Sequence, residues 1–473
     1  MSEIKVNKLS SRTGNAVTLG TSGDTFTIPS GVTLTNSGTA TGFGSDSDIS
    51  WQAVKTSDFT AASGEGYFVN TTGGAITITL PASPSLGDVV TIRDYAGTFA
   101  TNNITINRNS SPLGGTASNG TLSTNNSMTT LVYVDGTKGW LTTENEAQGG
   151  VIPPAFTSAT GGTVSTSGDY KIHTFNSSSN FVVSLAGNSP ISPTGGPAIA
   201  DYLIVAGGAG GGSGYGAAGG GAGGYRESKS PVAGTYTASP LASPTGLTIS
   251  AQTYPITVGA GGGGGPQGKR GVQGSNSIFS TITSAGGGYG GSYYDPAGQP
   301  YTGNAGGPGG SGGGEGGAAG SSGGTGNTPP VSPPQGNNGG SNQNSGNHHA
   351  SGGGGAGDTG GNGQNNGSNT PKTANGYGGH GGDGVTTAIK GSNGNYAGGG
   401  GGGRESNCAP HQGEGGSGGG GGAGLNATAG SNGGANQGGG GGGQGGTALI
   451  PSGYGSGGGS GGSGIVIIRY KYQ

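Results

Sequence analysis

Histidines are the side chains best suited to metal binding here, and their spacing argues against a metal site. The chain has five: His173, His348, His349, His380 and His411. His173 falls in an alternating apolar segment, whereas the others fall in polar segments without the paired spacing on a regular element that zinc sites use. We expect no metal site, and the one alternative joins His348 and His349 with His380. The single cysteine, Cys408, excludes an internal disulfide and a cysteine-based zinc site.

Two stretches have the spacing of nucleotide-binding motifs without their context. Residues 214–219 (GYGAAG) fit GxGxxG, and residues 263–270 (GGGPQGKR) come close to a phosphate-binding loop. No helical pattern follows either stretch, and Arg270 stands where the phosphate loop needs Ser or Thr. No Ser/His/Asp set can be assigned by spacing, and the carboxylates are too dispersed to nominate a glycosidase pair. We therefore expect neither a cofactor nor catalysis.

Tyrosine is the residue whose distribution points to a function. Fourteen of the 18 tyrosines lie in residues 201–473, among Gly, Ser and Asn. Binding loops have this composition, because Tyr offers rigid contact area while its small polar neighbours adapt. For the insertion tyrosines a structural role stays open, and we expect Tyr202, Tyr470 and Tyr472 to pack on strands. The candidate receptor-binding residues are Tyr293, Tyr294, Asp295, Tyr301, His348, His349, Tyr377, His380, Tyr396, Arg404 and His411.

The overall composition excludes several classes of protein. Apolar residues make up 28% and charged residues 8% of the 473 residues, both well below globular averages of about a half and about a quarter. The 17 Lys and Arg residues are scattered and the net charge is −3, so we expect no nucleic-acid partner. Residues 1–9 lack the apolar run of a secretory signal, and no window approaches a membrane span. We expect action outside a cell without a signal peptide.

The strands that would position these residues show period-2 alternation in the first half of the chain. Residues 1–45 alternate apolar residues with Thr, which predicts half-buried strands. Their apolar residues are too few for one copy to form a core, which favours a trimeric β-stem. A flexible N-terminal arm is the alternative. Residues 46–146 predict a small antiparallel sandwich whose core Trp51 and Trp140 would close. Residues 147–200 predict a linker followed by a hairpin of 170–175 with 180–185.

A glycine field fills residues 201–473 between two apolar strands, at 201–206 and 464–472. It holds 98 of the 124 glycines. Because side chains cannot offset the backbone entropy that glycine loses on folding, backbone hydrogen bonds must order it. Polyproline-II-type helices packed side by side can satisfy N–H and C=O groups across neighbours. We expect a polyglycine-II-like bundle that displays the insertions between its glycine runs, and a flexible Gly/Ser linker is the alternative.

Three parts of the sequence resemble tail-fibre proteins of marine and cyanobacterial tailed phages. Residues 3–9 and the Thr/Gly-rich strands to Gly44 look like virion-proximal stems, and residues 64–72, 76–81 and 132–140 look like a β module of such fibres. Residues 201–208, 221–226 and 461–470 look like their glycine-rich terminal domain, which is similar in character to the polyglycine-II adhesins of T-even-like phages. The resemblance implies a homotrimer that binds a tail or baseplate protein by its N-terminus and a receptor by loops at its tip.

Together these observations predict a mainly β, fibrous protein. Residues 1–45 would form the stem and virion attachment, 46–146 an antiparallel β module, 147–200 a linker and hairpin, and 201–473 a receptor-binding head. We expect a non-enzymatic tail fibre or adhesin that recognises a host glycan or outer-membrane protein. The alternatives are a structural glycine-rich virion fibre without a receptor, and an ice- or surface-binding protein. Thr is sparse in the late glycine runs, which counts against the latter.

Overall fold

The computed structural model describes residues 49–143, 154–189, 195–214, 216–292, 305–317, 321–342, 349–363, 378–404, 411–446 and 457–473. Over these residues the regular elements are β-strands, which confirms the mainly β prediction. Within the same residues there is no helix that could span a membrane. The predicted stem of residues 1–45 lies outside the described part of the chain.

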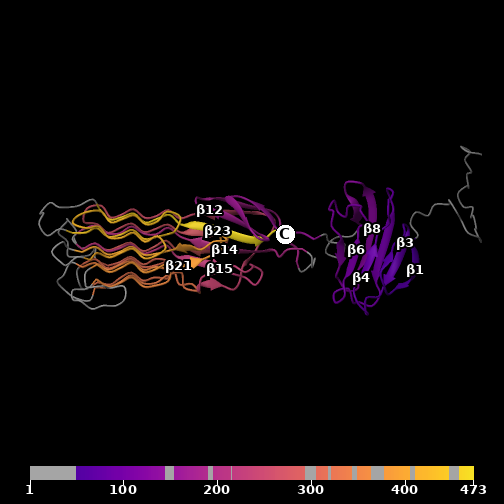
Figure 1. Ribbon diagram of the computed structural model, residues 1–473, viewed down its shortest axis with the longest axis horizontal. Helices are drawn as coiled ribbons and strands as arrows, with labels where there is room; N and C mark the ends of the chain where they lie inside the picture. The colour runs from indigo at the N-terminus through magenta and orange to yellow at the C-terminus, as the bar shows by residue number, and fades with distance from the viewer. Residues whose placement is uncertain are drawn as a thin grey trace, which may run out of the picture. The chain divides into compact units, whose positions relative to one another are not determined.

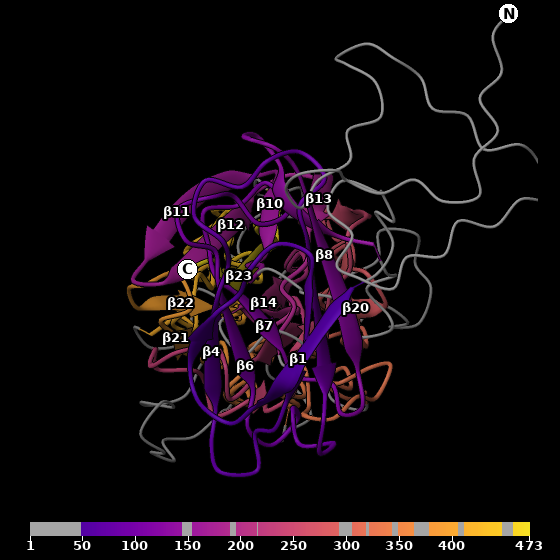
Figure 2. The same cartoon turned by 90° about the vertical axis from the view of Figure 1, so that its right-hand side faces the viewer.

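The β module is a sandwich of two open sheets, ordered β1-β3-β5-β8-β9 and β2-β4-β6-β7 (Figures 1 and 2). Its strands are β1 (Ser50–Lys55), β2 (Phe59–Thr60), β3 (Glu65–Val69), β4 (Ile76–Thr79), β5 (Val89–Asp94), β6 (Ile104–Asn107), β7 (Gly120–Leu122), β8 (Met128–Asp135) and β9 (Gly139–Thr142). The predicted antiparallel pairing holds for β5–β8, β6–β7 and β8–β9 and is wrong for β2–β4, β3–β5 and β4–β6. From β2 to β6 the chain alternates between the sheets, so β3 pairs parallel with β5, and β4 parallel with β2 and β6.

The core of the module contains only one of its two tryptophans. Trp140 is completely buried and packs edge-on against Tyr133, with ring centroids 5.6 Å apart. Trp51 lies on the edge strand β1, is 43% exposed, and stacks on Phe68 at the surface. The prediction that Trp51 closes the core is therefore wrong, because β1 is an edge strand whose residues are exposed or only partly buried.

The second part, here called the glycine-rich unit, runs from residue 154 to 473. Its strands are β10 (Ser158–Thr160), β11 (Thr163–Ser167), β12 (Tyr170–Phe175), β13 (Ser179–Leu185), β14 (Ile199–Val205), β15 (Tyr225–Ser228), β16 (Ala242–Ser243), β17 (Leu247–Thr248), β18 (Thr253–Thr257), β19 (Ser277–Phe279), β20 (Ile282–Ser284), β21 (Val385–Thr387), β22 (Gly394–Tyr396) and β23 (Ile465–Lys471). They form sheets ordered β11-β12-β23-β14-β15-β16 and β10-β13-β18-β19-β20, with β21 and β22 as a separate pair.

The two apolar strands that bracket the glycine field pair with each other. β14 and β23 run antiparallel, with Leu203 opposite Ile467, and both are buried on both faces. One face packs with Phe181 and Tyr254 of the neighbouring sheet, and the other packs with Tyr225 and Tyr396. Tyr202 and Tyr470 are buried and Tyr472 is partly buried, so the expectation that these three pack on strands is confirmed.

The hairpin predicted from residues 170–175 and 180–185 does not form. β12 pairs with β11 and β23, whereas β13 pairs with β10 and β18 in the other sheet. The short connection after Phe175 therefore crosses between sheets, which lets Phe175 and Phe181 meet in the core with ring centroids 6.5 Å apart. These strands share sheets with β14, β18 and β23 and do not form a separate unit.

Beyond β14 the chain continues as extended glycine segments that lie side by side (Figure 1). In segment 206–213, every third N–H donates to the same neighbour. Residues 206, 209 and 212 donate to carbonyls 224, 221 and 218, and residues 207, 210 and 213 donate to carbonyls 275, 272 and 269. Residues 208 and 211 donate to carbonyls 462 and 459, and all these donor–acceptor distances are 2.9–3.0 Å. The N–H groups of this segment thus point in three directions, and each direction recurs every three residues.

The carbonyls of the same segment face three other neighbours. Carbonyls 207 and 210 accept from N–H groups 287 and 290, carbonyls 208 and 211 from 262 and 265, and carbonyls 209 and 212 from 441 and 444. The N–H groups therefore contact antiparallel segments and the carbonyls contact parallel ones. Segment 398–403 has the same period, with N–H groups 398 and 401 donating to carbonyls 418 and 421. We call this hydrogen-bonded set of segments the glycine array.

Glycine is required inside the array because neighbouring backbones come too close for a Cβ. A Cβ on Gly208 would lie 2.0 Å from the carbonyl oxygen of Gly439, and one on Gly211 would lie 2.2 Å from that of Gly442. On the flank the constraint is lifted. Gly263 is exposed and its Cβ would meet only Val272, at 3.9 Å, and Val272 itself is 55% exposed. Large side chains are thus tolerated where the array faces solvent.

The buried His173 is expected to make the protein less stable in mild acid. Burial lowers the pKa of the His173 imidazole below its usual 6.5, opposed by a 2.7 Å hydrogen bond from Nδ1 to the Gly161 carbonyl. The imidazole of His173 therefore binds a proton more readily in the unfolded chain than in the folded protein. The folded state keeps its full stability above about pH 6.5, where His173 is neutral in both states, and loses stability as the pH falls below that. We expect the Tm of the wild type to drop between pH 7.5 and pH 5.5, and that of His173→Gln to drop less. Thermal unfolding measured by circular dichroism tests this, and an equal drop in both proteins would contradict it.

Candidate functional site

Polar side chains gather at the ends of the glycine segments that lie farthest from the strands. Ser213 Oγ donates to Gln444 Oε1 at 2.6 Å and accepts from the Gly268 N–H at 3.0 Å. Ser292 Oγ donates to the Gly268 carbonyl at 3.0 Å. Ser213, Ser292 and Gln444 are all buried. These bonds join the ends of four glycine segments. They supply hydrogen-bond partners at the point where the regular backbone bonding of the segments stops.

A buried carboxylate organises the neighbouring part of this end. Glu315 is fully buried, and its Oε1 accepts from the Ser321 N–H at 3.2 Å and hydroxyl at 2.9 Å. Its Oε2 accepts from the Asn342 N–H at 2.6 Å, and Asn342 Oδ1 accepts from Ser351 Oγ at 3.0 Å. Burial raises the pKa of the Glu315 carboxyl, although the bonds from Asn342 and Ser321 oppose the shift. Glu315 therefore ties together the ends of four segments.

His349 and Arg404 complete this set of residues. They are 3% and 8% exposed, and their backbones form an isolated antiparallel bridge. The Arg404 carbonyl also accepts from the Gly446 N–H at 2.9 Å. We call this region the loop end. Its residues are Ser213, Ser292, Glu315, Asn342, His349, Arg404 and Gln444.

The loop end is where the longer connections of the chain leave the array. Residues 292, 321, 342, 349, 404 and 446 belong to it or bond to it, and each borders a stretch outside the described residues. Gly379 donates to the Ala350 carbonyl and Gly458 to the Gly265 carbonyl, which places residues 378 and 457 at the same end. Each of the connections 293–304, 318–320, 343–348, 364–377, 405–410 and 447–456 therefore borders at least one described residue at this end.

Ten of the eleven candidate receptor-binding residues fall into three groups. The connections at the loop end, outside the described residues, carry Tyr293, Tyr294, Asp295, Tyr301, His348 and Tyr377. His349 and Arg404 are buried within the loop end, where they hold segments and offer little surface. His380 is half-buried and its Nδ1 accepts from the Glu414 N–H at 3.1 Å, and His411 is exposed where its segment re-enters the array.

Tyr396 lies away from this end. It ends β22, is 5% exposed, and belongs to the core beneath β14 and β23. Burial raises the pKa of its phenol, with Glu227 adding to the shift. Its ring therefore fills the core and is not presented to a receptor, so we do not keep it among the contact residues. Residues 385–387 (VTT) and 394–396 (GNY) are too short and too weakly patterned to indicate the β21–β22 pair from the sequence.

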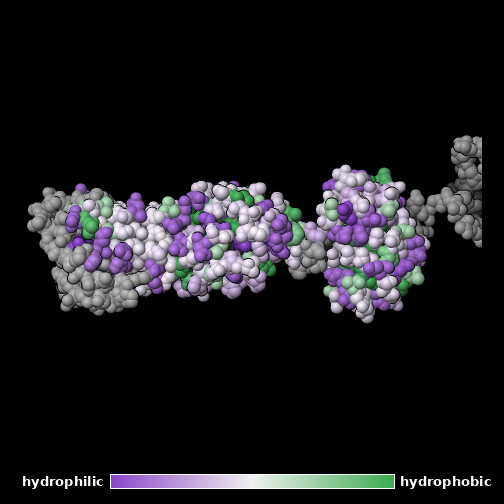
Figure 3. All heavy atoms as spheres, in the orientation of Figure 1, coloured by the Kyte–Doolittle hydropathy of each residue, from purple (hydrophilic) through white to green (hydrophobic). Residues whose placement is uncertain are grey.

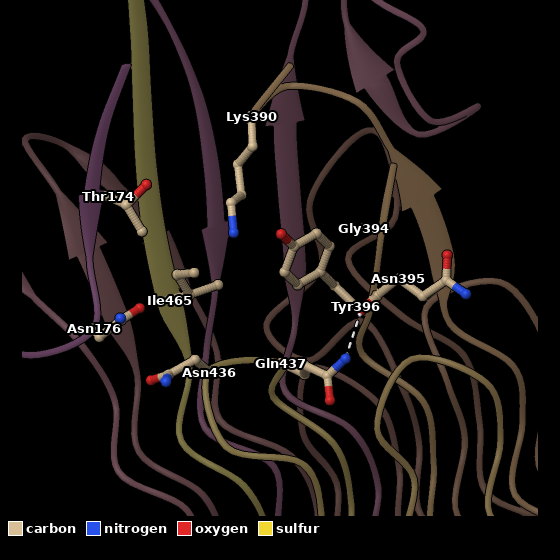
Figure 4. A pocket seen from close by; sticks show the side chains of 9 residues that line it. All are labelled: Thr174, Asn176, Lys390, Gly394, Asn395, Tyr396, Asn436, Gln437 and Ile465. Carbon is tan, nitrogen blue, oxygen red and sulfur yellow. Dashed lines mark hydrogen bonds between the residues drawn. The ribbon is translucent and has the colours of Figure 1, made fainter. Parts of the chain in front are cut away.

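A polar pocket of about 300 Å³ lies beside Tyr396 (Figure 4). It is lined by Thr174, Asn176, Lys390, Gly394, Asn395, Tyr396, Asn436, Gln437 and Ile465. Figure 4 shows the Lys390 amine and the Tyr396 hydroxyl pointing into the space, while Gln437 Nε2 donates to the Asn395 carbonyl at 3.2 Å. Apart from Tyr396, sequence reasoning missed these residues, because they come together from β12, the β21–β22 pair and the turn before residue 437.

Metal ligands do not converge in the part of the chain that the structure describes. There, no three His, Cys, Asp or Glu side chains lie together as a metal site would need. His348 is outside the described residues, so the alternative set with His349 and His380 stays a hypothesis.

The comparison with protein families bears on the same region. Residues 183–471 match a family described as a glycine-rich domain. The match covers more than half of the chain and begins within β13, before the glycine field itself. It confirms that the chain contains a glycine-rich domain and places the start of that domain before residue 201, whereas β10, β11 and β12 lie outside the match. No curated protein matches the chain.

Proposed function

Because this chain belongs to the glycine-rich domain family, we propose that the glycine array serves as the rigid support of a receptor-binding head in a phage tail fibre or adhesin. In this proposal the protein is non-enzymatic and without a cofactor. Its N-terminal residues attach to a tail or baseplate protein of the virion. The connections at the loop end recognise a glycan or outer-membrane protein on the host cell.

The observation that carries the proposal is the gathering of the connections at one end of the array. Six of the candidate residues fall in these connections, including the tyrosine pair at 293–294. The flank of the array is largely pale in the hydropathy view, as expected of glycine, and offers few side chains for recognition (Figure 3). Buried Glu315 and Gln444 hold the segment ends in place beneath the connections. A rigid support that displays variable loops is the usual arrangement of binding sites on protein scaffolds.

Two finer features belong to the proposal. The period of three in the hydrogen bonds of segments 206–213 and 398–403 is that of polyproline II, which supports a polyglycine-II-like array. The protein would assemble as a homotrimer through a β-stem formed by residues 1–45. Light scattering of the purified protein tests the assembly, and a monomer at micromolar concentration would contradict it.

Replacing the connections while keeping the array tests the receptor-binding role. In the variant, residues 293–304, 343–348, 364–377 and 405–410 become Gly/Ser segments of equal length. We prefer replacement to deleting residues 327–350, because that deletion would also remove segment 335–342, whose Gly339 and Gly340 bond to the array. Since a few aromatic and Arg residues dominate most interfaces, we expect binding of labelled protein to susceptible cells to fall by at least about 100-fold.

The control variant changes exposed residues on the flank, Val272→Ser with Gln273→Ser, and should bind cells as the wild type does. Thermal unfolding should give similar Tm values for all three proteins, because both variants keep the glycine segments and the backbone hydrogen bonds that join them. Unchanged cell binding by the replaced variant would contradict the proposal. If no susceptible cell binds the wild type, the structural virion-fibre alternative is favoured.

A further inference from the structure

A second pocket, of about 460 Å³, opens at the strands of the glycine-rich unit, away from the loop end. It is lined by Ser167, Gly168, Asp169, Tyr170, Thr235, Tyr236, Thr237, Ala388, Gly391 and Arg469. Arg469 lies opposite Asp201 in the β14–β23 pair, whereas the glycine array continues from Val205 at the other end of β14. The loop end and this pocket are therefore at opposite ends of the unit. We call it the Arg469 pocket.

Arg469 is an unusual lining residue because it is charged and only 4% exposed. Its guanidinium lies over the rings of Tyr170 and Tyr236, 4.3 and 5.1 Å from their centroids. Nε donates to the Ala233 carbonyl at 3.2 Å and Nη1 to the Ile389 carbonyl at 3.4 Å. A guanidinium has five N–H donors, so two neutral acceptors leave others for the pocket.

The nearby carboxylate of Asp201 is already engaged elsewhere. It accepts from the Ser230 N–H at 2.6 Å, the Ser230 hydroxyl at 2.7 Å and the Ser228 hydroxyl at 3.0 Å. Burial lowers the pKa of Arg469, while Tyr236, Tyr170 and Asp201 oppose that shift. A buried cation is normally paired with an anion, because taking it out of water is costly. Among the described residues Arg469 contacts carbonyls and aromatic rings in place of a bonded carboxylate.

A purely structural role explains part of this arrangement. Arg469 joins the loops at Ala233 and Ile389 to β23, and two carbonyl bonds are sufficient for that. That role leaves unexplained why the guanidinium borders an open pocket. Ser167, Thr235 and Thr237 also line this pocket, and within the described residues their hydroxyls make no hydrogen bond. The pocket therefore offers one cation and several hydroxyls beside two fixed aromatic rings.

We propose that the Arg469 pocket binds a uronic acid residue, with the sugar carboxylate on the Arg469 guanidinium and its ring hydroxyls on Ser167, Thr235 and Thr237. Arginine suits this role because its planar fork matches a carboxylate. The volume admits a single sugar ring and leaves the pocket open for a chain to continue. The uronate comes either as a free monosaccharide or as a residue of an acidic polysaccharide.

Calorimetry on the full-length protein tests the proposal with matched sugars. Sodium D-glucuronate and D-glucose differ at carbon 6, where a carboxylate replaces a hydroxymethyl group. We expect glucuronate to bind at least about ten-fold more tightly than glucose, because charge-assisted hydrogen bonds are roughly twice as strong as neutral ones. An alginate oligosaccharide is the second arm. Tighter binding than glucuronate assigns the pocket to a polysaccharide, and weaker binding assigns it to a free uronate.

Two surface variants of opposite sign separate binding from folding. Asp169 is the carboxylate that lines the pocket, and it is exposed, as is Thr235. Asp169→Asn should tighten glucuronate binding about two- to five-fold, and Thr235→Glu should weaken it by at least as much. Both should keep the wild-type Tm. Equal affinity for the two sugars, or no response to either charge change, would overturn the proposal. Replacing the connections at the loop end should leave glucuronate binding unchanged, so this test is independent of the receptor-binding role.

Discussion

Gly208→Ala is expected to destabilise the glycine-rich unit by about 3 kcal/mol, the upper end of the usual cost of overpacking. Its new Cβ would lie 2.0 Å from the Gly439 carbonyl oxygen and 2.8 Å from that of Gly438. Gly208 also donates to Gly462 and accepts from Gly262, so the backbone cannot move away from one neighbour without losing another. Overpacking that cannot relax is the costly kind. Urea denaturation followed by circular dichroism measures the loss.

Gly263→Ala is the matched control within the same array. There the nearest heavy atom to a new Cβ is Val272 Cγ2 at 3.9 Å, and the residue is exposed. We expect stability to stay within about 1 kcal/mol of the wild type or to rise slightly, because alanine restricts the unfolded chain. A similar stability for the two variants would show that the array tolerates side chains generally, and the close packing described here would be wrong.

Phe181→Ala should destabilise the glycine-rich unit by about 3–5 kcal/mol. Phe181 is completely buried between the two sheets and contacts the rings of His173, Phe175, Tyr254, Phe279 and Tyr470. Truncation leaves a cavity lined by large rings, which cannot collapse without disturbing β23. Denaturant unfolding followed by the near-ultraviolet signal of the tyrosines measures this cost.

Val182→Ala provides the control on the same strand. Val182 is 37% exposed on the opposite face of β13, so we expect a loss below about 1 kcal/mol. If both variants lost equally little, the aromatic cluster would not be the core of this part. If both lost equally much, β13 itself and not its inward face would determine the stability.

Strand positions could be predicted from the sequence where alternation is strong. Residues 170–175, 201–206 and 464–472 were expected as strands and correspond to β12, β14 and β23. Strand partners could not be predicted in the same way. The pattern of Ile76–Thr79 does not indicate that β4 lies between two parallel strands. The pattern of β12 does not indicate that β12 and β13 belong to different sheets. Pairing depends on which sheet each connection crosses to, and period-2 alternation carries no such information.

For the glycine field, the sequence predicts the kind of interaction that orders it but not which segments pair. Its composition predicts that backbone hydrogen bonds must order it. The partners of Gly208, which are residues 462 and 262, cannot be read from runs of identical residues. Register is set instead by residues outside the runs, such as Ser213 with Gln444 and Glu315 with Asn342. The bracket strands β14 and β23 were the strongest local signal, and they hold the first and last segments together.

The candidate site was predicted from composition, which does not distinguish buried residues from exposed ones. Tyr396 and Arg404 share a polar glycine background with Tyr293, yet burial places the first in the strand core and the second within the loop end. Arg469 was not nominated at all. It reads as one residue of an apolar strand, and only the loops at Ala233 and Ile389 make it the base of a pocket.

Hydroxyl-radical footprinting of the protein bound to susceptible cells tests most directly where recognition occurs. The account predicts that binding protects Tyr293, Tyr294, Tyr301 and Tyr377, which lie in the connections at the loop end. Exposed residues on the flank and the β module, such as Val272 and Trp51, should stay as reactive as in the free protein. Protection of Val272 or Trp51 with unchanged reactivity of the four tyrosines would contradict it.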